Sequence, residues 1–163
     1  GVTSIISDSG VTRYRVNTEE WMMYDRKKPS YWAFEKGVYM EQFDSIFNVE
    51  ASIKADTAYY YDKERLWKLI GNVDIQNRKG ERFNTELLYW NEATQKVYSD
   101  KFIRIQQPDR IITGHGFDSN QQMTIYTIRN IEGIFYVDEE ASSGPPQPET
   151  KALPDSVNKD TAK

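Results

Sequence analysis

The sequence contains no cysteine, a single histidine (His115) and no apolar run longer than four residues. Without cysteine the chain has no disulfide framework, no thiolate metal site and no thiol nucleophile, and this absence leaves the compartment open. One histidine excludes a metal site built from several imidazoles. The short apolar runs leave nothing within these residues that could cross a bilayer as a helix or serve as a signal-peptide core.

Neither sign of charge predominates in the sequence. The chain has 21 basic and 25 acidic residues with no basic block, a formal net charge of -4 and a pI of about 5.1. A nucleic-acid-binding surface needs clustered Lys and Arg. We therefore do not expect nucleic acid as a partner.

Aromatic residues, in contrast, make up 13% of the chain and include 11 tyrosines, a composition typical of half-exposed strands. The apolar residues Trp67, Leu69, Val73 and Ile75 share one parity, and mostly polar residues fill the other. This alternation indicates a strand with one buried face. Turn signals such as residues 78–81 (RKGE) separate segments of this kind, so the sequence predicts an all-β fold.

A weak internal repeat carries more information. Residues 15–19 (RVNTE) and 82–86 (RFNTE) are identical at four of five positions, and residues 53–56 (IKAD) and 112–115 (ITGH) fill the same slot. The slot is an apolar residue, a polar one, a small one and then usually an acid. Each copy is followed by an aromatic-rich strand, a polar turn and a second strand, as in residues 59–67 and 89–97, and this order predicts hairpins. Single hairpins cannot bury an apolar face alone, so neighbouring copies must cover one another.

The composition changes near residue 137. Four of the six prolines follow it, together with Ser, Gly, Lys and Asp, and no aromatic residue follows Tyr136. Such a segment cannot bury enough apolar surface to offset the entropy of ordering it. We expect a folded domain over residues 1–137 and a flexible tail over residues 138–163.

Four short segments, in this order, resemble the LptC family within the OstA/LptA class: residues 6–10 (ISDSG), 71–73 (GNV), 98–100 (YSD) and 114–117 (GHGF). The resemblance covers about residues 5–135. It implies a twisted, open β-jellyroll of two antiparallel sheets in the periplasm, behind an N-terminal anchor in the inner membrane. We expect that anchor to lie in a segment that precedes residue 1.

The resemblance also implies a non-catalytic component of lipopolysaccharide export that needs no cofactor or metal. Apolar residues at alternating positions of the predicted strands would otherwise be expected to form a closed core. The resemblance implies instead that they form the wall of a groove for acyl chains. The groove residues expected on this basis are Trp32, Phe34, Val38, Met40, Ile53, Ala55, Trp67, Leu69, Val73, Ile75, Phe83, Val97, Ile103, Ile105 and Ile112.

The implied partners are the lipid A acyl chains of lipopolysaccharide, an LptA-like periplasmic bridge protein and an LptB/LptF/LptG-type ABC transporter complex. Open sheet edges offer unpaired backbone groups to another strand. We expect the region 124–135 to meet the bridge protein, with Thr124, Tyr126, Ile128 and Asn130 at that edge. The N-terminal strands, about residues 4–16, would meet the transporter.

Other interpretations stay open beside this one. His115 stands between two glycines and is expected at a bend between strands, and the repeat acids Glu19, Asp56 and Glu86 suit structural positions better than a catalytic carboxylate pair. The tyrosines of residues 59–61 could stack on sugar rings, although cross-strand packing is the commoner role. The alternative function is therefore a cell-surface β-sandwich that binds glycan or protein.

Overall fold

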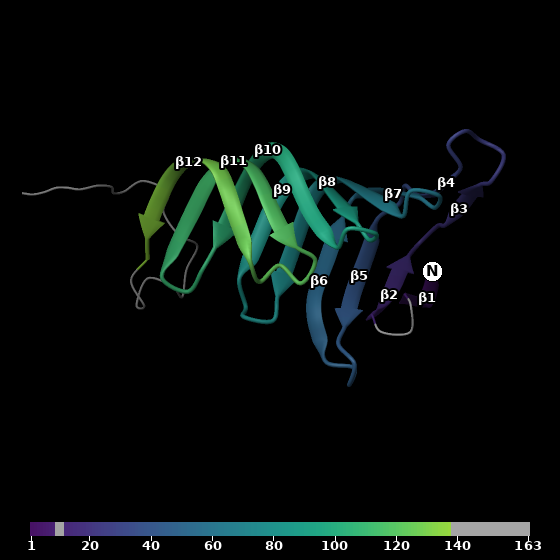
Figure 1. Ribbon diagram of the computed structural model, residues 1–163, viewed down its shortest axis with the longest axis horizontal. Helices are drawn as coiled ribbons and strands as arrows, with labels where there is room; N and C mark the ends of the chain where they lie inside the picture. The colour runs from purple at the N-terminus through teal and green to yellow at the C-terminus, as the bar shows by residue number, and fades with distance from the viewer. Residues whose placement is uncertain (9–11, 138–163) are drawn as a thin grey trace, which may run out of the picture.

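The computed structural model describes residues 1–8 and 12–137, and within them every element is a β-strand (Figure 1). The prediction of a flexible tail over residues 138–163 falls outside the described residues. No helix in the described part of the chain has the length and apolar character needed to cross a membrane. The strands are β1 (Val2–Asp8), β2 (Thr12–Thr18), β3 (Met22–Tyr24), β4 (Tyr31–Phe34), β5 (Val38–Phe43), β6 (Val49–Ala55), β7 (Thr57–Tyr61), β8 (Leu66–Asn77), β9 (Arg82–Asn91), β10 (Lys96–Gln106), β11 (Arg110–Asn120) and β12 (Tyr126–Tyr136).

The strands form one antiparallel sheet that forks at β8. The main path runs β1-β2-β5-β6-β8-β9-β10-β11-β12, and a branch of β3, β4 and β7 joins the first half of β8. Residues Leu66–Ile70 pair with β7, whereas Asp74–Asn77 pair with β6. We call the part containing β1, β2, β5 and β6 layer A, and the part containing β3, β4 and β7 layer B. Strands β8 to β12 contribute one half to each layer.

The long strands bend where they pass from one layer to the other. The pairing register shifts at Ile70/Val73, Ser99/Phe102 and Thr113/Gly114, and such bulges let a strand turn sharply. Figure 1 shows these strands arching side by side. The two layers then face one another, and the Phe83 ring of layer A lies 5.7 Å from the Phe117 ring of layer B. The predicted all-β jellyroll is confirmed, and its two facing layers are parts of one continuous antiparallel sheet.

The sequence repeat marks these bends. Each copy lies where the chain leaves layer A for layer B, and its small residue is buried there: Thr18, Ala55, Thr85 and Gly114. The Thr18 hydroxyl donates to the Gly37 carbonyl (2.7 Å), and the Thr85 hydroxyl donates to the Phe102 carbonyl (2.7 Å). A Cβ atom at Gly114 would lie 2.4 Å from the Asn130 carbonyl oxygen. A larger side chain therefore has no room on the inside of the bend.

The acids of the repeat lie on the outside of the same bends, where they are exposed. The Asp56 carboxylate accepts a hydrogen bond from the Asn72 side chain (2.8 Å), and Glu86 accepts one from the Asn72 backbone N–H (3.3 Å). Asn72 has a positive φ of 47° at the bend of β8. The acids thus hold an otherwise strained bend in place.

Candidate functional site

The structure gathers all fifteen residues expected to line the groove into one apolar cluster between the layers. Thirteen of them are at most 8% exposed, and the other two, Trp32 and Ile112, are half-buried against the same cluster. The prediction of which side chains face inward follows from period-two alternation, because one parity of each strand points between the layers. Whether these side chains bind lipid stays a prediction.

The layers are in contact in this structure. A cavity between them, lined by Tyr14, Gln42 and Ala51 of layer A and by Trp90 and Gln121 of layer B, has a volume of only about 10 Å³. That is room for about one water molecule. An acyl chain could enter this interior only after the two layers move apart.

Hairpin turns form two rims along the side of the jellyroll opposite the bends. The rim of layer A consists of residues 44–48, 78–81 and 107–109, and the rim of layer B consists of residues 62–65, 92–95 and 121–125. Parting of the layers on this side would expose the interior without breaking any strand pairing, because the strands turn back at the rims.

Polar contacts join the two rims. The Tyr14 hydroxyl of layer A donates to the Glu92 carboxylate of layer B. Farther along, the Asn77 side-chain amide donates to the Met123 carbonyl (2.8 Å), and the Gln107 amide donates to the Tyr126 hydroxyl (2.7 Å). We call this row of contacts the seam: it consists of Tyr14, Gln42, Asn77 and Gln107 on layer A and Glu92, Gln121, Met123 and Tyr126 on layer B.

Glu92 also connects the seam to two aromatic side chains of layer B. Its carboxylate is 5% exposed and also accepts hydrogen bonds from the Tyr60 hydroxyl (2.8 Å) and the Trp67 indole N–H (3.2 Å). The Arg65 guanidinium lies 3.8 Å away and partly balances its charge. Burial, and then the negative charge of Glu92, raise the pKa of Tyr14, so Tyr14 remains a proton donor.

The role of Glu92 could not be predicted from the sequence. Its only local signal is an acid in a polar turn directly after residues 87–90 (LLYW), and an exposed turn acid would look the same. Its partner Tyr14 lies 78 positions away. Only the pairing of the strands brings the two residues together.

Gln42 is the weak point of the seam. It pairs with Tyr14 across the β2–β5 register, is 5% exposed, and has neither its amide oxygen nor its amide nitrogen in a hydrogen bond. Buried amide groups in this state are costly unless a water molecule reaches them. The small cavity next to Gln42 suits such a water.

The two ends of the sheet are β1 and β12, which lie at opposite ends of the molecule (Figure 1). Of the residues predicted at the partner-binding edge, Tyr126, Ile128 and Asn130 lie in β12 and Thr124 lies in the turn before it. Tyr126 and Ile128 are half-buried against the core, whereas Asn130 is exposed. The neighbouring Ile131 is 57% exposed.

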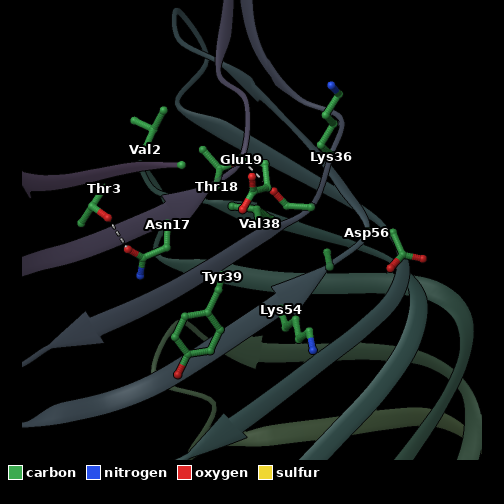
Figure 2. A pocket seen from close by; sticks show the side chains of 13 residues that line it. Val2, Thr3, Asn17, Thr18, Glu19, Lys36, Val38, Tyr39, Lys54 and Asp56 are labelled. Carbon is green, nitrogen blue, oxygen red and sulfur yellow. Dashed lines mark hydrogen bonds between the residues drawn. The ribbon is translucent and has the colours of Figure 1, made fainter.

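A larger hollow of about 590 Å³ lies elsewhere (Figure 2). It opens on the outer side of layer A beside Val2 and Tyr39, and its charged side chains are of both signs. Of the predicted groove residues only Val38 and Ala55 reach it. This hollow is therefore distinct from the interior between the layers.

His115, Tyr59 and Tyr61 lie at the surface and contact neighbouring side chains. His115 is exposed at the bend of β11 and contacts the Glu132 carboxylate. The Tyr31 ring lies 5.9 Å from both the Tyr59 and the Tyr61 ring on the outer side of layer B, as cross-strand neighbours do. Among the described residues no group of three or more His, Asp or Glu side chains is arranged to hold a metal ion.

Comparison with known proteins places these features in a family. No curated protein matches the chain. A family model described as "Lipopolysaccharide-assembly, LptC-related" matches residues 3–136, which include nearly all the described residues. Proteins of this family are periplasmic components of lipopolysaccharide transport. The chain belongs to the LptC family.

Proposed function

We propose that this chain holds the acyl chains of lipopolysaccharide between its two layers and passes them to the next jellyroll of a periplasmic bridge. The observation that supports this most is the single apolar cluster that extends from β2 to the partly buried residues of β12 between the layers. Along one side it is bordered by rims that are joined by polar contacts of side chains rather than by strand pairing.

The energetics suit a carrier. Each methylene moved from water into an apolar interior is stabilised by about 0.8 kcal/mol, and a membrane offers a similar stabilisation. Transfer between the membrane and the protein, or between two similar proteins, is then nearly balanced in free energy. Net movement needs another source, and in this proposal an LptB/LptF/LptG-type ABC transporter supplies it.

The ends of the sheet suit docking. Strand β12 would pair with an LptA-like bridge protein, and β1 would face the transporter, because a terminal strand presents backbone groups on its outer side that another strand can complete. Pairing at both ends would align the interiors of successive jellyrolls. The placement of this chain at the inner membrane, behind an anchor, belongs to the same proposal.

Site-specific photo-crosslinking tests the carrier function. A photoreactive phenylalanine analogue replaces Phe83, which is fully buried between the layers, or Phe102, which is 45% exposed at a bend. In cells we expect crosslinks to lipopolysaccharide from position 83 and none from position 102. Equal crosslinking at both positions would contradict the proposal. Competition by oligosaccharide without lipid A, as effective as that by intact lipopolysaccharide, would favour the glycan-binding alternative.

The docking edge needs a separate test. The same analogue at Ile131 of β12 should crosslink to an LptA-like protein, whereas at Ile46, which is 73% exposed in the β5–β6 turn, it should not. The variant Ile128→Pro should reduce the crosslink at position 131, because proline removes a backbone donor and disturbs β12. Undiminished crosslinking in that variant would argue against pairing through β12.

A further inference from the structure

The seam consists of large polar side chains that are buried, although they border an apolar interior. Four large polar side chains in it are at least nine-tenths buried: Gln42, Asn77, Glu92 and Gln121. Glu92 and Gln121 lie on the rim of layer B, and Gln42 and Asn77 lie at the strand ends beside the rim of layer A, while the side chains deeper between the layers are apolar. Apolar residues at these rim positions would join the layers as well and would leave no amide unsatisfied, as that of Gln42 is.

Polar contacts differ from apolar ones in how they respond to separation. When two layers part and water enters, a hydrogen bond between them is replaced by hydrogen bonds to water, so the net loss is only a fraction of the strength of the bond in an apolar interior. Apolar walls lose their stabilisation unless another apolar surface takes their place. A polar rim over an apolar interior therefore separates readily when an acyl chain is present to cover the walls.

Tyr14 lies on a strand that belongs to only one of the two layers. Strands β8 to β12 run through both layers, but β2 belongs to layer A alone and β7 to layer B alone. Glu92 connects these two branches, since it accepts hydrogen bonds from Tyr14 of β2 and from Tyr60 of β7. Gln42, the neighbour of Tyr14 in the sheet, adds no hydrogen bond of its own.

We infer that the Tyr14–Glu92 hydrogen bond is a latch on the seam, and that acyl chains reach the interior where the rims part beside it. This inference rests on the proposed carrier function and names the route by which that lipid enters. Tyr14 and Glu92 are positioning residues in this scheme: they set how often the layers separate and do not need to contact the lipid.

Thiol labelling measures the parting of the rims. Because the chain has no cysteine, the variant Gln42→Cys carries one thiol, at a position that is 5% exposed. Its labelling by a maleimide in the folded protein reports opening. Adding Tyr14→Phe keeps the ring and removes the hydroxyl, and we expect labelling to become about tenfold faster, as loss of a hydrogen bond to a charged group predicts.

A matched control is available on the outer surface. Tyr59 donates a hydrogen bond to the Glu35 carboxylate (2.8 Å), so Tyr59→Phe removes the same chemical contact away from the seam. Labelling at position 42 should then change by less than about twofold. Equal acceleration by Tyr59→Phe and Tyr14→Phe, or none by Tyr14→Phe, would overturn the inference.

A crosslink connects the latch to lipid capture. Gln42 and Gln121 line the same small cavity from opposite rims, and a bifunctional thiol reagent on the double cysteine variant would hold the rims together. With fluorescent lipopolysaccharide as the probe, we expect capture by the double variant to fall at least tenfold on crosslinking, relative to the same variant without the reagent. Undiminished capture in the crosslinked protein overturns the inference and leaves the carrier function intact. No capture by the wild-type chain overturns both.

Discussion

Removal of the Glu92 carboxylate measures the contribution of the buried acceptor that bonds Tyr14 of layer A to layer B. The variant Glu92→Ala takes one acceptor away from three donors: the Tyr14 hydroxyl, the Tyr60 hydroxyl and the Trp67 indole N–H. A buried donor left without its acceptor costs about 1 to 3 kcal/mol. Water that enters the vacated space would offset part of this loss, so we expect the free energy of unfolding to fall by about 3 kcal/mol.

The variant Glu92→Gln separates charge from shape. Glutamine keeps one carbonyl oxygen as an acceptor, and its amide can donate to a tyrosine hydroxyl, which both donates and accepts. The bonds that remain are between neutral groups and therefore weaker. The expected loss is about 1 to 2 kcal/mol, between the wild-type chain and the alanine variant.

Urea unfolding followed by tryptophan fluorescence is the assay, because Trp67 is fully buried between the layers and its emission should change when unfolding exposes it. The slope of the unfolding free energy against urea should stay constant across the variants, which shows that stability alone has changed. Glu64→Ala, an exposed acid in the neighbouring β7–β8 turn, is the control and should stay within about 0.5 kcal/mol of the wild-type chain. A loss below about 1 kcal/mol for Glu92→Ala would refute the assigned role.

Three further predictions concern the core, a bend and the outer surface. Leu69→Glu places a carboxylate at a fully buried site and should unfold the chain rather than merely block lipid, as far-UV circular dichroism would show. Gly114→Ala should cost about 3 kcal/mol in urea unfolding because its Cβ meets backbone 2.4 Å away, whereas Gly80→Ala, with nothing within 4 Å, carries only the strain of its positive φ, about 1 kcal/mol. The hydrogen bond to Glu35, and then burial, raise the pKa of Tyr59 to about 12. The stabilisation by Tyr59 should therefore be complete below about pH 10 and be lost as the pH rises towards 12. Ultraviolet titration of the wild-type chain against Tyr59→Phe measures the raised pKa on which this pH range depends.

The fold could be predicted because its signals are local. Alternation along residues 66–77 indicates which side chains point inward, and the structure leaves Trp67 and Ile75 fully buried. The repeat could be found by comparing short segments, and its physical meaning is equally local: a small residue such as Thr85 fits inside a bend and an acid such as Glu86 lies outside it. The residues that determine these features lie within the short segment that forms each hairpin.

The closure of the interior could not be predicted in the same way. Alternation says which face of a strand is apolar, but it does not say how far the opposite layer lies from that face. This distance depends on contacts between residues remote in sequence, such as Asn77 with Met123 and Tyr14 with Glu92. For the same reason a charged substitution at Ile103, which is fully buried, would disrupt the core rather than test lipid binding.

A closed interior is compatible with a carrier, and it constrains the mechanism. An acyl chain that enters between the layers replaces wall-to-wall contacts with wall-to-lipid contacts of the same apolar kind, so this exchange changes the free energy little. The contacts that have no replacement in the lipid are those of the seam. In the proposed mechanism the seam therefore decides how often the layers part, and the apolar cluster decides how strongly the lipid is held. Variants of Tyr14 should accordingly raise the rate of lipid capture, whereas truncation of Phe83 should lower the amount bound at equilibrium.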